Sequence, residues 1–290
     1  RLLILSNYST WIRNDFRHLL GIAGELFDRD DFRYYGRDYI EDTLWVYQNY
    51  KSNVEKPEPL TSIAYRDGGY YILRNDRVYC CIRCGELSFR GDGVHSHNDQ
   101  LSFELNVDGE DFIIDPGSYV YTADYKMRNL FRSTEMHNTV QVENFEQNNF
   151  EEYNLFYMKE QTYAKNHGFN MNFFEGTHIG FKEKCNIIHK RTVLLEENSV
   201  LIKDQLIGDT NKSAQITLIL SPDVVVKLEE SENKVVLEKG SICIKFDYIR
   251  TLKIENCWVS NSYGYKQSSK KITIPFSKEL SIKMTIENKR

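Results

Sequence analysis

A short segment about a third of the way along the chain concentrates side chains that can do chemistry. Residues 91–100 read GDGVHSHNDQ and place His95, His97 and Asp99 within five positions, directly before the apolar run LSFELNV. In an extended segment, residues two apart point the same way, so both imidazoles can face one pocket. The segment therefore predicts a functional site at the edge of a structured element.

Two further residues complete a candidate ligand set. Asp115 ends the run DFIID directly before a Pro-Gly turn, and His137 opens the run NTVQVE. Two histidines and one carboxylate from three strand ends make a competent Zn²⁺ site. A structural interpretation competes with this one, because aspartate before Pro-Gly is an ordinary turn residue and a lone histidine is often only hydrogen-bonded. Spacing alone leaves both interpretations open.

The elements that must position these residues read as strands joined by tight turns. Apolar residues alternate along LSFELNV, which predicts a half-buried strand with the histidines at its entrance. A hairpin turn at Asp108-Gly109 then folds the next strand back, so that residue 115 lies roughly opposite residue 101 or 102. We expect this hairpin to return Asp115 close to His97.

Residues 56–290 contain many more strand signals. A second hairpin is predicted in IAYRDGGYYILR, and further strands in NTVQVE, TVLLEENSVLIKDQ, AQITLIL, KVVLEKGSICIKF and LSIKMTIE. More than ten short strands with local turns predict a mainly β domain, a large antiparallel, multilayered β-sandwich, rather than an α/β fold.

Residues 1–55 differ from the rest and predict a helical segment. The stretch STWIRNDFRHLLGIAGELF has the apolar spacing of one helix face, with Ser9 or Thr10 as the N-cap. A second helix is predicted in YIEDTLWVYQNY, and KSNVEKPEPL, with two prolines, reads as a linker. Two such helices are too small for a domain, so we interpret them as the tail of a larger helical unit or a brace against the sheet.

Composition excludes some classes of protein. The 290 residues carry a net charge of −5, which argues against a nucleic-acid module, and no apolar stretch is long enough for a membrane span. The chain begins with Arg1, which we interpret as a processed form or a fragment. Cys81 and Cys84 form one isolated CxxC, which we interpret as buried apolar residues rather than a zinc pair.

The central residues resemble a known family. The segment GDGVHSHNDQLSFELNVDGEDFIIDPGSYVY, followed by RNLFRSTEMHNTVQVENFEQ, is similar to the heparinase II/III-like polysaccharide lyases over about sixty residues. The shared pattern runs H-x-H-x-D, S-F, a D-G hairpin, R-x-x-x-R-S-T-x-x-H-N-T-V and a later Gln. A weaker continuation holds His189, Arg191 and Asp204.

The resemblance implies an α/α-toroid joined to the β-sandwich, with the active site between them and a structural zinc in the sandwich. Mapped residue by residue, it implies that His97, Asp115 and His137 are the zinc ligands and that His95 reaches into the catalytic cleft. Tyr121 and Arg128 fall in the loop that lines the cleft in relatives, with Tyr119 and Tyr125 as alternative registers for the tyrosine. The helices at residues 1–55 would be a remnant of the toroid.

The reaction that the resemblance implies is β-elimination on a uronate-containing, acidic polysaccharide such as a glycosaminoglycan. The sugar carboxylate must be neutralised, a base must remove the C5 proton, and an acid must protonate the leaving oxygen. In relatives a tyrosine serves as base or acid, and these residues come largely from the toroid. We therefore expect this chain alone to be inactive, with an N-terminal toroid of the same protein as its partner.

Basic and aromatic residues around the motif are candidates for substrate binding. Arg132 can grip a carboxylate or sulfate through its fork of donors, or can pair with Glu135 on the surface. Tyr119 and Tyr125 can stack on sugar rings or simply pack. Asn138 is interpreted as structural.

Two other functions stay open. The chain can be a non-catalytic, metal-stabilised carbohydrate-binding module, or, less consistent with its helical start, a cupin-like metal enzyme. The cupin pattern usually adds a glutamate soon after H-x-H, and Glu104 comes several positions too late. By resemblance the protein is periplasmic or secreted, whereas unpaired-looking cysteines favour the cytoplasm, so the compartment stays open.

Overall fold

A computed structural model describes residues 15–209, 211–248 and 251–289. The chain divides into two compact units, one up to Leu60 and one from Thr61 onwards. The boundary expected after residue 55 thus falls five residues later, beyond the two prolines of the linker.

The first unit is a small group of helices. It contains α1 (Arg17–Leu26), α2 (Asp30–Gly36), a 3-10 turn (Arg37–Tyr39) and α3 (Ile40–Val46). The helices expected from the apolar spacing are present as α1 and α3, whereas Ser9 and Thr10 lie outside the described residues. The short α2 has no sequence periodicity of its own and was not predicted. It packs on α1 through Gly21 and Gly36, where a side chain on Gly36 would meet the Gly21 backbone at 2.2 Å.

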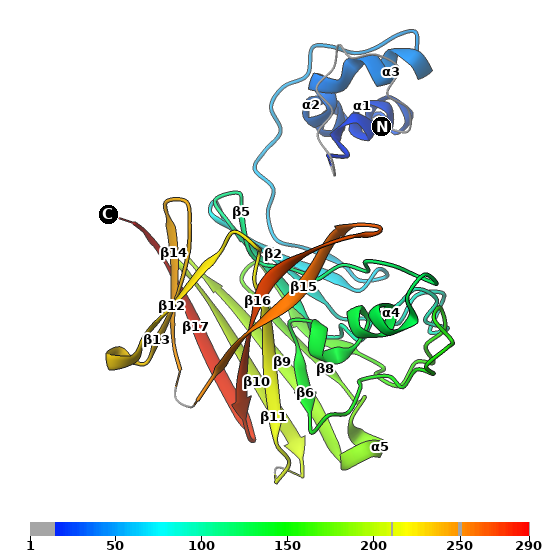
Figure 1. The fold of residues 1–290 in the computed structure, drawn as a ribbon. Helices are drawn as coiled ribbons and strands as arrows, with labels where there is room; N and C mark the ends of the chain where they lie inside the picture. Colours follow the sequence, from blue (N-terminus) through cyan, green and yellow to red (C-terminus); the bar gives the residue numbers. More distant parts are fainter. Residues whose placement is uncertain (1–14, 210, 249–250, 290) are drawn as a thin grey trace. The chain divides into compact units, whose positions relative to one another are not determined.

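The second unit is built from three antiparallel sheets (Figure 1). The first has the order β1-β2-β3-β4-β5, the second β12-β13-β14-β17-β10-β9-β8-β7, and the third β15-β16-β11-β6. Their bounds are β1 (Ile63–Tyr65), β2 (Tyr70–Arg74), β3 (Val78–Arg83), β4 (Phe103–Val107), β5 (Glu110–Ile113), β6 (Val140–Val142), β7 (Lys165–Phe169), β8 (Phe173–His178), β9 (Ile187–Glu196), β10 (Ser199–Gly208), β11 (Ala214–Ile219), β12 (Val225–Glu229), β13 (Lys234–Lys239), β14 (Ile242–Asp247), β15 (Lys253–Ser262), β16 (Tyr265–Phe276) and β17 (Glu279–Asn288). The antiparallel, multilayered β fold predicted from the turn spacing is confirmed.

Few helices interrupt the strands of this unit. They are α4 (Tyr125–Phe131), α5 (Lys182–Cys185) and 3-10 turns at Thr134–Met136 and Glu230–Glu232. Asp124 caps α4 by accepting a hydrogen bond from the Met127 N–H at 3.1 Å. Helix α4 carries Arg128, whose side chain is buried.

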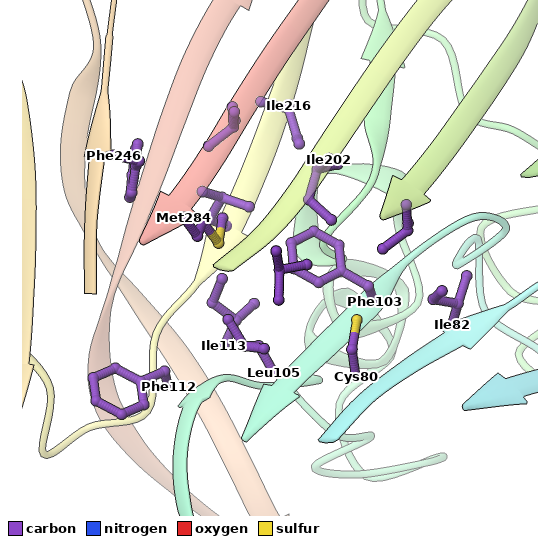
Figure 2. Close-up of a cluster of buried hydrophobic side chains, with 14 of the residues drawn as sticks. Cys80, Ile82, Phe103, Leu105, Phe112, Ile113, Ile202, Ile216, Phe246 and Met284 are labelled. Atoms are coloured by element: carbon purple, nitrogen blue, oxygen red, sulfur yellow. The ribbon is translucent and has the colours of Figure 1, made fainter. Parts of the chain in front are cut away.

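One hydrophobic core joins the three sheets. Alternate residues of β9 and β10 are buried, which is the burial pattern expected of strands with one face in a core. Figure 2 shows Phe103 and Ile82 of the first sheet, Ile202 and Met284 of the second and Ile216 of the third pointing into the same space. A core shared by all three sheets fixes their edges, and these edges carry the loops of the site.

The predicted hairpins are confirmed, with one shift in register. Strands β4 and β5 pair Val107 with Glu110, and a bulge follows between Leu105 and Asn106, so that Leu105 opposes Ile113. The bulge adds one residue to the returning strand, which moves residue 115 one position from the partner expected from regular pairing. Asp115 nevertheless returns to the histidine loop.

All six cysteines are free thiols, and Cys80 and Cys84 are buried in the first sheet and its edge. Burial raises the pKa of the Cys84 thiol to about 12, which keeps it protonated and inert. Cys84 has the buried, apolar role predicted for the CxxC, whereas Cys81 lies half-buried on the outward face of β3. Among the described residues, no helix is long and apolar enough to cross a membrane.

Candidate functional site

The residues singled out by the sequence gather around one hollow of the β-sandwich unit. This hollow, called the histidine pocket below, has a volume of about 670 Å³. Its walls come from the outward face of β2–β4 and from the loop between β3 and β4, and include Arg83, His95, His97, Asp99, Glu104 and Asp115. An open pocket with convergent polar side chains is the usual form of a ligand site.

A buried frame of amides holds the histidine loop in place. Gln147 accepts from the Gln100 N–H at 2.9 Å and donates to the Gln100 carbonyl at 3.0 Å, as a neighbouring strand would. Asn98 is buried and donates to Asn148 O at 2.9 Å and Glu146 Oε2 at 2.7 Å. These bonds satisfy the backbone of a loop that lies outside the sheets, and they give Gln147 a structural role that the motif alone did not assign.

His95 lies exposed at the rim of the pocket, next to aromatic rings. Its backbone is left-handed, with φ of 63°, an unusual conformation for a residue other than glycine. The backbone is held there by a 3.1 Å hydrogen bond from His95 N–H to Phe156 O. The ring centroids of Tyr121 and Phe156 lie 5.3 Å and 5.1 Å from the imidazole. The predicted proximity of His95 and Tyr121 is therefore present, and Phe156 is an unpredicted third member.

His97 points from the pocket wall toward the interior and contacts Arg128. Arg128 Nη1 lies 2.7 Å from His97 Nε2, and Ser118 Oγ lies 3.4 Å from the same nitrogen. Burial, together with the charges of His137 and Arg128, holds the pKa of His97 well below its usual range. The neutral ring therefore accepts from the permanently charged guanidinium through Nε2.

Asp115 and His137 form a close pair beneath the pocket. His137 Nδ1 lies 2.9 Å from Asp115 Oδ2, and the second carboxylate oxygen accepts from the Gly117 N–H at 2.8 Å. Burial alone would lower the pKa of His137, but the Asp115 carboxylate outweighs it and raises that pKa. His137 Nε2 is buried and has no hydrogen-bond partner among the described residues. A buried nitrogen without a partner is costly unless a ligand completes it.

These positions test the zinc set that the resemblance implies. The rings of His97 and His137 lie 5.2 Å apart, and two imidazoles with a carboxylate are a typical zinc donor set. The unpartnered His137 Nε2 supplies an open ligand position. Within the described ranges, however, no three His, Cys, Asp or Glu donors converge as placed, and His97 Nε2 contacts Arg128. The donor types are those that zinc prefers.

The two arginines of the motif are buried, contrary to the expected cleft and surface positions. Arg132 donates to the backbone carbonyls of Asn154 at 2.9 Å and Glu151 at 3.3 Å, and lies over the Phe150 ring at 4.2 Å. This burial does not support the predicted substrate contact of Arg132, nor its alternative pairing with Glu135. Arg128 is also fully buried, and it reaches the site through His97 and the Tyr121 ring, 5.6 Å from its guanidinium.

The other candidate tyrosines lie near the site without lining the histidine pocket. Tyr119 packs against Phe131, with ring centroids 5.6 Å apart, and carries Lys266 Nζ at 4.9 Å over its face. Tyr125 opens α4 and packs on Tyr153 at 5.0 Å. Both rings are half-buried, so packing accounts for their observed contacts.

Glu104 is an acidic residue of the pocket that was not predicted as a site member. Glu104 lies on the outward face of β4, and burial, with the nearby Asp115 charge, raises its pKa to about 7. Burial also raises the pKa of Asp99. The strand alternation of LSFELNV already places Glu104 opposite the core face, so a signal existed. The histidine pocket is thus mixed in charge rather than simply basic.

A buried ion pair of the central sheet contacts the histidine loop and the segment that carries His137. Arg191 of β9 and Asp204 of β10 are joined by two bonds of 2.8 Å, and His189 lies 2.7 Å from the same carboxylate. The free end of Arg191 donates to the backbone carbonyls of Leu101 and Asn138, which follow the histidine loop and His137. Arg191 therefore ties the two segments to the central sheet. Asn138, buried, bonds to Phe103 O and Ile114 O at 2.9 Å each, which confirms its predicted structural role.

Comparison with known proteins gives a family match over most of the chain. Residues 57–287 match the family model described as heparinase II/III-like, C-terminal. A heparin-sulfate lyase of Bacteroides stercoris is 25% identical over 234 residues, which cover 76% of this chain and 32% of that protein. A heparin-sulfate lyase of Pedobacter heparinus is 26% identical over 145 residues, covering 49% of this chain and 20% of that protein.

Solved structures give the same fold. A crystal structure of a heparan sulfate lyase mutant from Pedobacter heparinus superposes with a TM-score of 0.73 at 18% identity. It covers 94% of this chain and 41% of that chain. The chain therefore spans less than half the length of these relatives, whereas the shared fold covers nearly all of the present chain.

Proposed function

Because the chain belongs to the heparinase II/III-like family through its C-terminal domain, we propose that it is the β-sandwich part of a lyase that cleaves an acidic, uronate-containing polysaccharide by β-elimination. The observation that carries the proposal is His95 at the rim of the histidine pocket, with Tyr121 5.3 Å away between ring centroids. An imidazole at the rim of a pocket and a phenol in contact with it can share the proton transfers that elimination requires.

The residues around His95 have distinct roles in this proposal. His95 is exposed, so it can donate a hydrogen bond to the sugar carboxylate or exchange a proton with the reacting sugar. Tyr121 contacts His95 and is available as a base or acid at the same sugar. Arg128 is a positioning residue, because it is buried and contacts the site through His97 and Tyr121. An N-terminal toroid of the same protein would supply the opposite wall of the cleft.

We also propose that His97, Asp115 and His137 hold a structural Zn²⁺. When bound, the metal would stabilise the folded loops by joining the segments before β4, after β5 and before β6. The proposal is supported by the donor types and by the unpartnered His137 Nε2. Metal content by mass spectrometry on untagged protein tests it. We expect about one zinc per chain, lost in His97→Ala but kept in His167→Ala, an exposed histidine of β7. Metal-free wild-type protein that is fully folded would refute this assignment.

The substrate class is tested by removing the carboxylates from the glycan. We expect this chain to bind heparan sulfate oligosaccharides and to bind their carboxyl-reduced forms at least tenfold more weakly, because a lost charge-assisted hydrogen bond costs about 1.5–3 kcal/mol. Equal binding of both forms would contradict a site that recognises uronate. A non-catalytic sugar-binding module would also pass this test, and it is separated from a lyase only by an assay of bond cleavage.

A further inference from the structure

The turn between β15 and β16 is attached to the segment that carries Asp115. Gly264 N–H donates to Tyr119 O at 2.8 Å, and Ser260 N–H donates to Pro116 O at 2.7 Å. The approach is close, since a side chain on Gly117 would meet Ser260 O at 2.0 Å. Within the turn, the Ser260 hydroxyl shares its one proton between two carbonyl oxygens, Tyr265 O at 2.7 Å and Ser262 O at 2.9 Å. A strand hairpin far along the sequence is thereby fixed beside the site.

This hairpin extends the aromatic surface that begins at His95. The Tyr263 ring lies 5.6 Å from Tyr121, whose ring lies 5.4 Å from Phe156 and 5.3 Å from His95. Tyr263 is 65% exposed, although its ring contacts Tyr121. We call the four rings of His95, Phe156, Tyr121 and Tyr263 the aromatic shelf. It runs continuously from the rim of the histidine pocket to the tip of the hairpin.

A cation lies on the same hairpin. Lys266 Nζ lies 4.9 Å from the centre of the Tyr119 ring and 4.7 Å from that of Trp258, and these contacts hold the long side chain against aromatic faces. The negative faces of aromatic rings attract a lysine ammonium that lies over them. An exposed tyrosine ring and a lysine on the same hairpin match a chain of sugar rings that carry carboxylate or sulfate groups.

We infer that the aromatic shelf and Lys266 form an accessory binding subsite for an acidic oligosaccharide, which takes the sugar units that continue beyond the histidine pocket. The inference rests on the proposed function, because the histidine pocket must take the first units. Tyr263 then stacks on a sugar ring, and Lys266 attracts its anionic substituent. The occupant is an acidic glycan rather than a protein segment because the shelf continues from the pocket rim and its outer ring, Tyr263, shares a hairpin with Lys266.

The test compares two lengths of one ligand. The affinity of this chain for a heparan sulfate disaccharide and for an octasaccharide is measured by calorimetry for wild type, Tyr263→Ala, Tyr263→Phe and Lys266→Gln. Tyr65→Ala serves as the matched control, since Tyr65 is a similarly exposed tyrosine, 54%, on β1. Thermal melting of each variant checks that the fold is kept.

We expect Tyr263→Ala to weaken octasaccharide binding about three- to tenfold, the range of one aromatic contact, and to leave disaccharide binding unchanged. Tyr263→Phe should keep the affinity because the ring face is kept. Lys266→Gln should weaken octasaccharide binding at low salt more than at high salt. Tyr65→Ala should have no effect.

Four outcomes would overturn the inference. Octasaccharide affinity that is unchanged in Tyr263→Ala, or an affinity loss that is equal for both lengths, would refute the subsite and leave the proposed function intact. Wild-type protein that binds neither length would refute the proposed function and the subsite together. Octasaccharide binding that becomes tighter in Tyr263→Ala would show that the Tyr263 ring obstructs the glycan instead of binding it.

Discussion

The Arg191–Asp204 pair allows the most quantitative prediction from this structure. Both side chains are buried, with 0% and 1% exposure, and they share two bonds of 2.8 Å. Arg191→Met leaves the Asp204 charge buried with only His189 beside it. Breaking a buried pair in this way costs about 3–5 kcal/mol, and the freed carbonyls of Leu101 and Asn138 add about 1 kcal/mol or more.

The expected loss of about 5 kcal/mol is comparable to the whole free energy of unfolding of many domains. We therefore expect Arg191→Met to be largely unfolded or to unfold at much lower urea concentration, as followed by far-ultraviolet circular dichroism. The double variant Arg191→Met/Asp204→Leu removes the stranded charge, and should recover about 2 kcal/mol or more. It also keeps the test informative where the single variant fails to fold.

A surface pair provides the control. Arg77 and Asp108 pair at 2.7 Å while 26% and 35% exposed, so Arg77→Met should cost about 1 kcal/mol or less. If Arg191→Met were no less stable than Arg77→Met, or if the double variant were less stable than Arg191→Met, the assignment of Arg191 as the support of the histidine segments would be wrong.

Two further predictions follow from buried groups. Burial holds the pKa values of His178 and His189 below their usual range, so the unfolded chain binds protons that the folded chain does not. The free energy of unfolding should therefore fall as the pH drops below about 6.5, by up to about 1.4 kcal/mol per pH unit for each histidine. His178→Gln should reduce the slope of the urea midpoint against pH, and an unchanged slope would contradict this prediction. Gly117 has φ of 80°, and a Cβ added there would lie 2.0 Å from the β15 backbone, so Gly117→Ala should lower the free energy of unfolding by about 2 kcal/mol or more in chemical denaturation. Gly109 has φ of 88° but open space around it, so Gly109→Ala should lower it by only about 1 kcal/mol. Equal losses would show that the β15 backbone moves easily to make room for the methyl group.

Local signals predicted much of the fold and part of the site. The Asp108-Gly109 turn and the alternation of LSFELNV are sufficient for the β4–β5 hairpin, because turn chemistry and strand period act over a few residues. The hairpin in turn brings Asp115 back, so its return to the pocket that His97 also lines could be anticipated. The 2.9 Å contact of Asp115 with His137 does not follow from the hairpin.

Long-range packing accounts for what the sequence did not predict. Phe156 and Tyr263 reach His95 and Tyr121 from distant segments, and an aromatic residue carries no sign of such a contact. The burial of Arg132 was missed because arginine is usually exposed, and here the carbonyls of a loop about twenty residues later satisfy its guanidinium. Sequence spacing predicts neither the distant aromatic contacts nor the backbone carbonyls that bind a buried arginine.

The central claim is that this β-sandwich serves a polysaccharide lyase in which His95 acts at the sugar. The most direct measurement is the ultraviolet absorbance of unsaturated uronate ends released from heparan sulfate, using the protein expressed from its complete reading frame. We predict that the wild type and His167→Ala release these ends, and that His95→Ala lowers the rate about a hundredfold or more while keeping fold and metal content. Glycan binding without any unsaturated ends, or full activity in His95→Ala, would contradict the account.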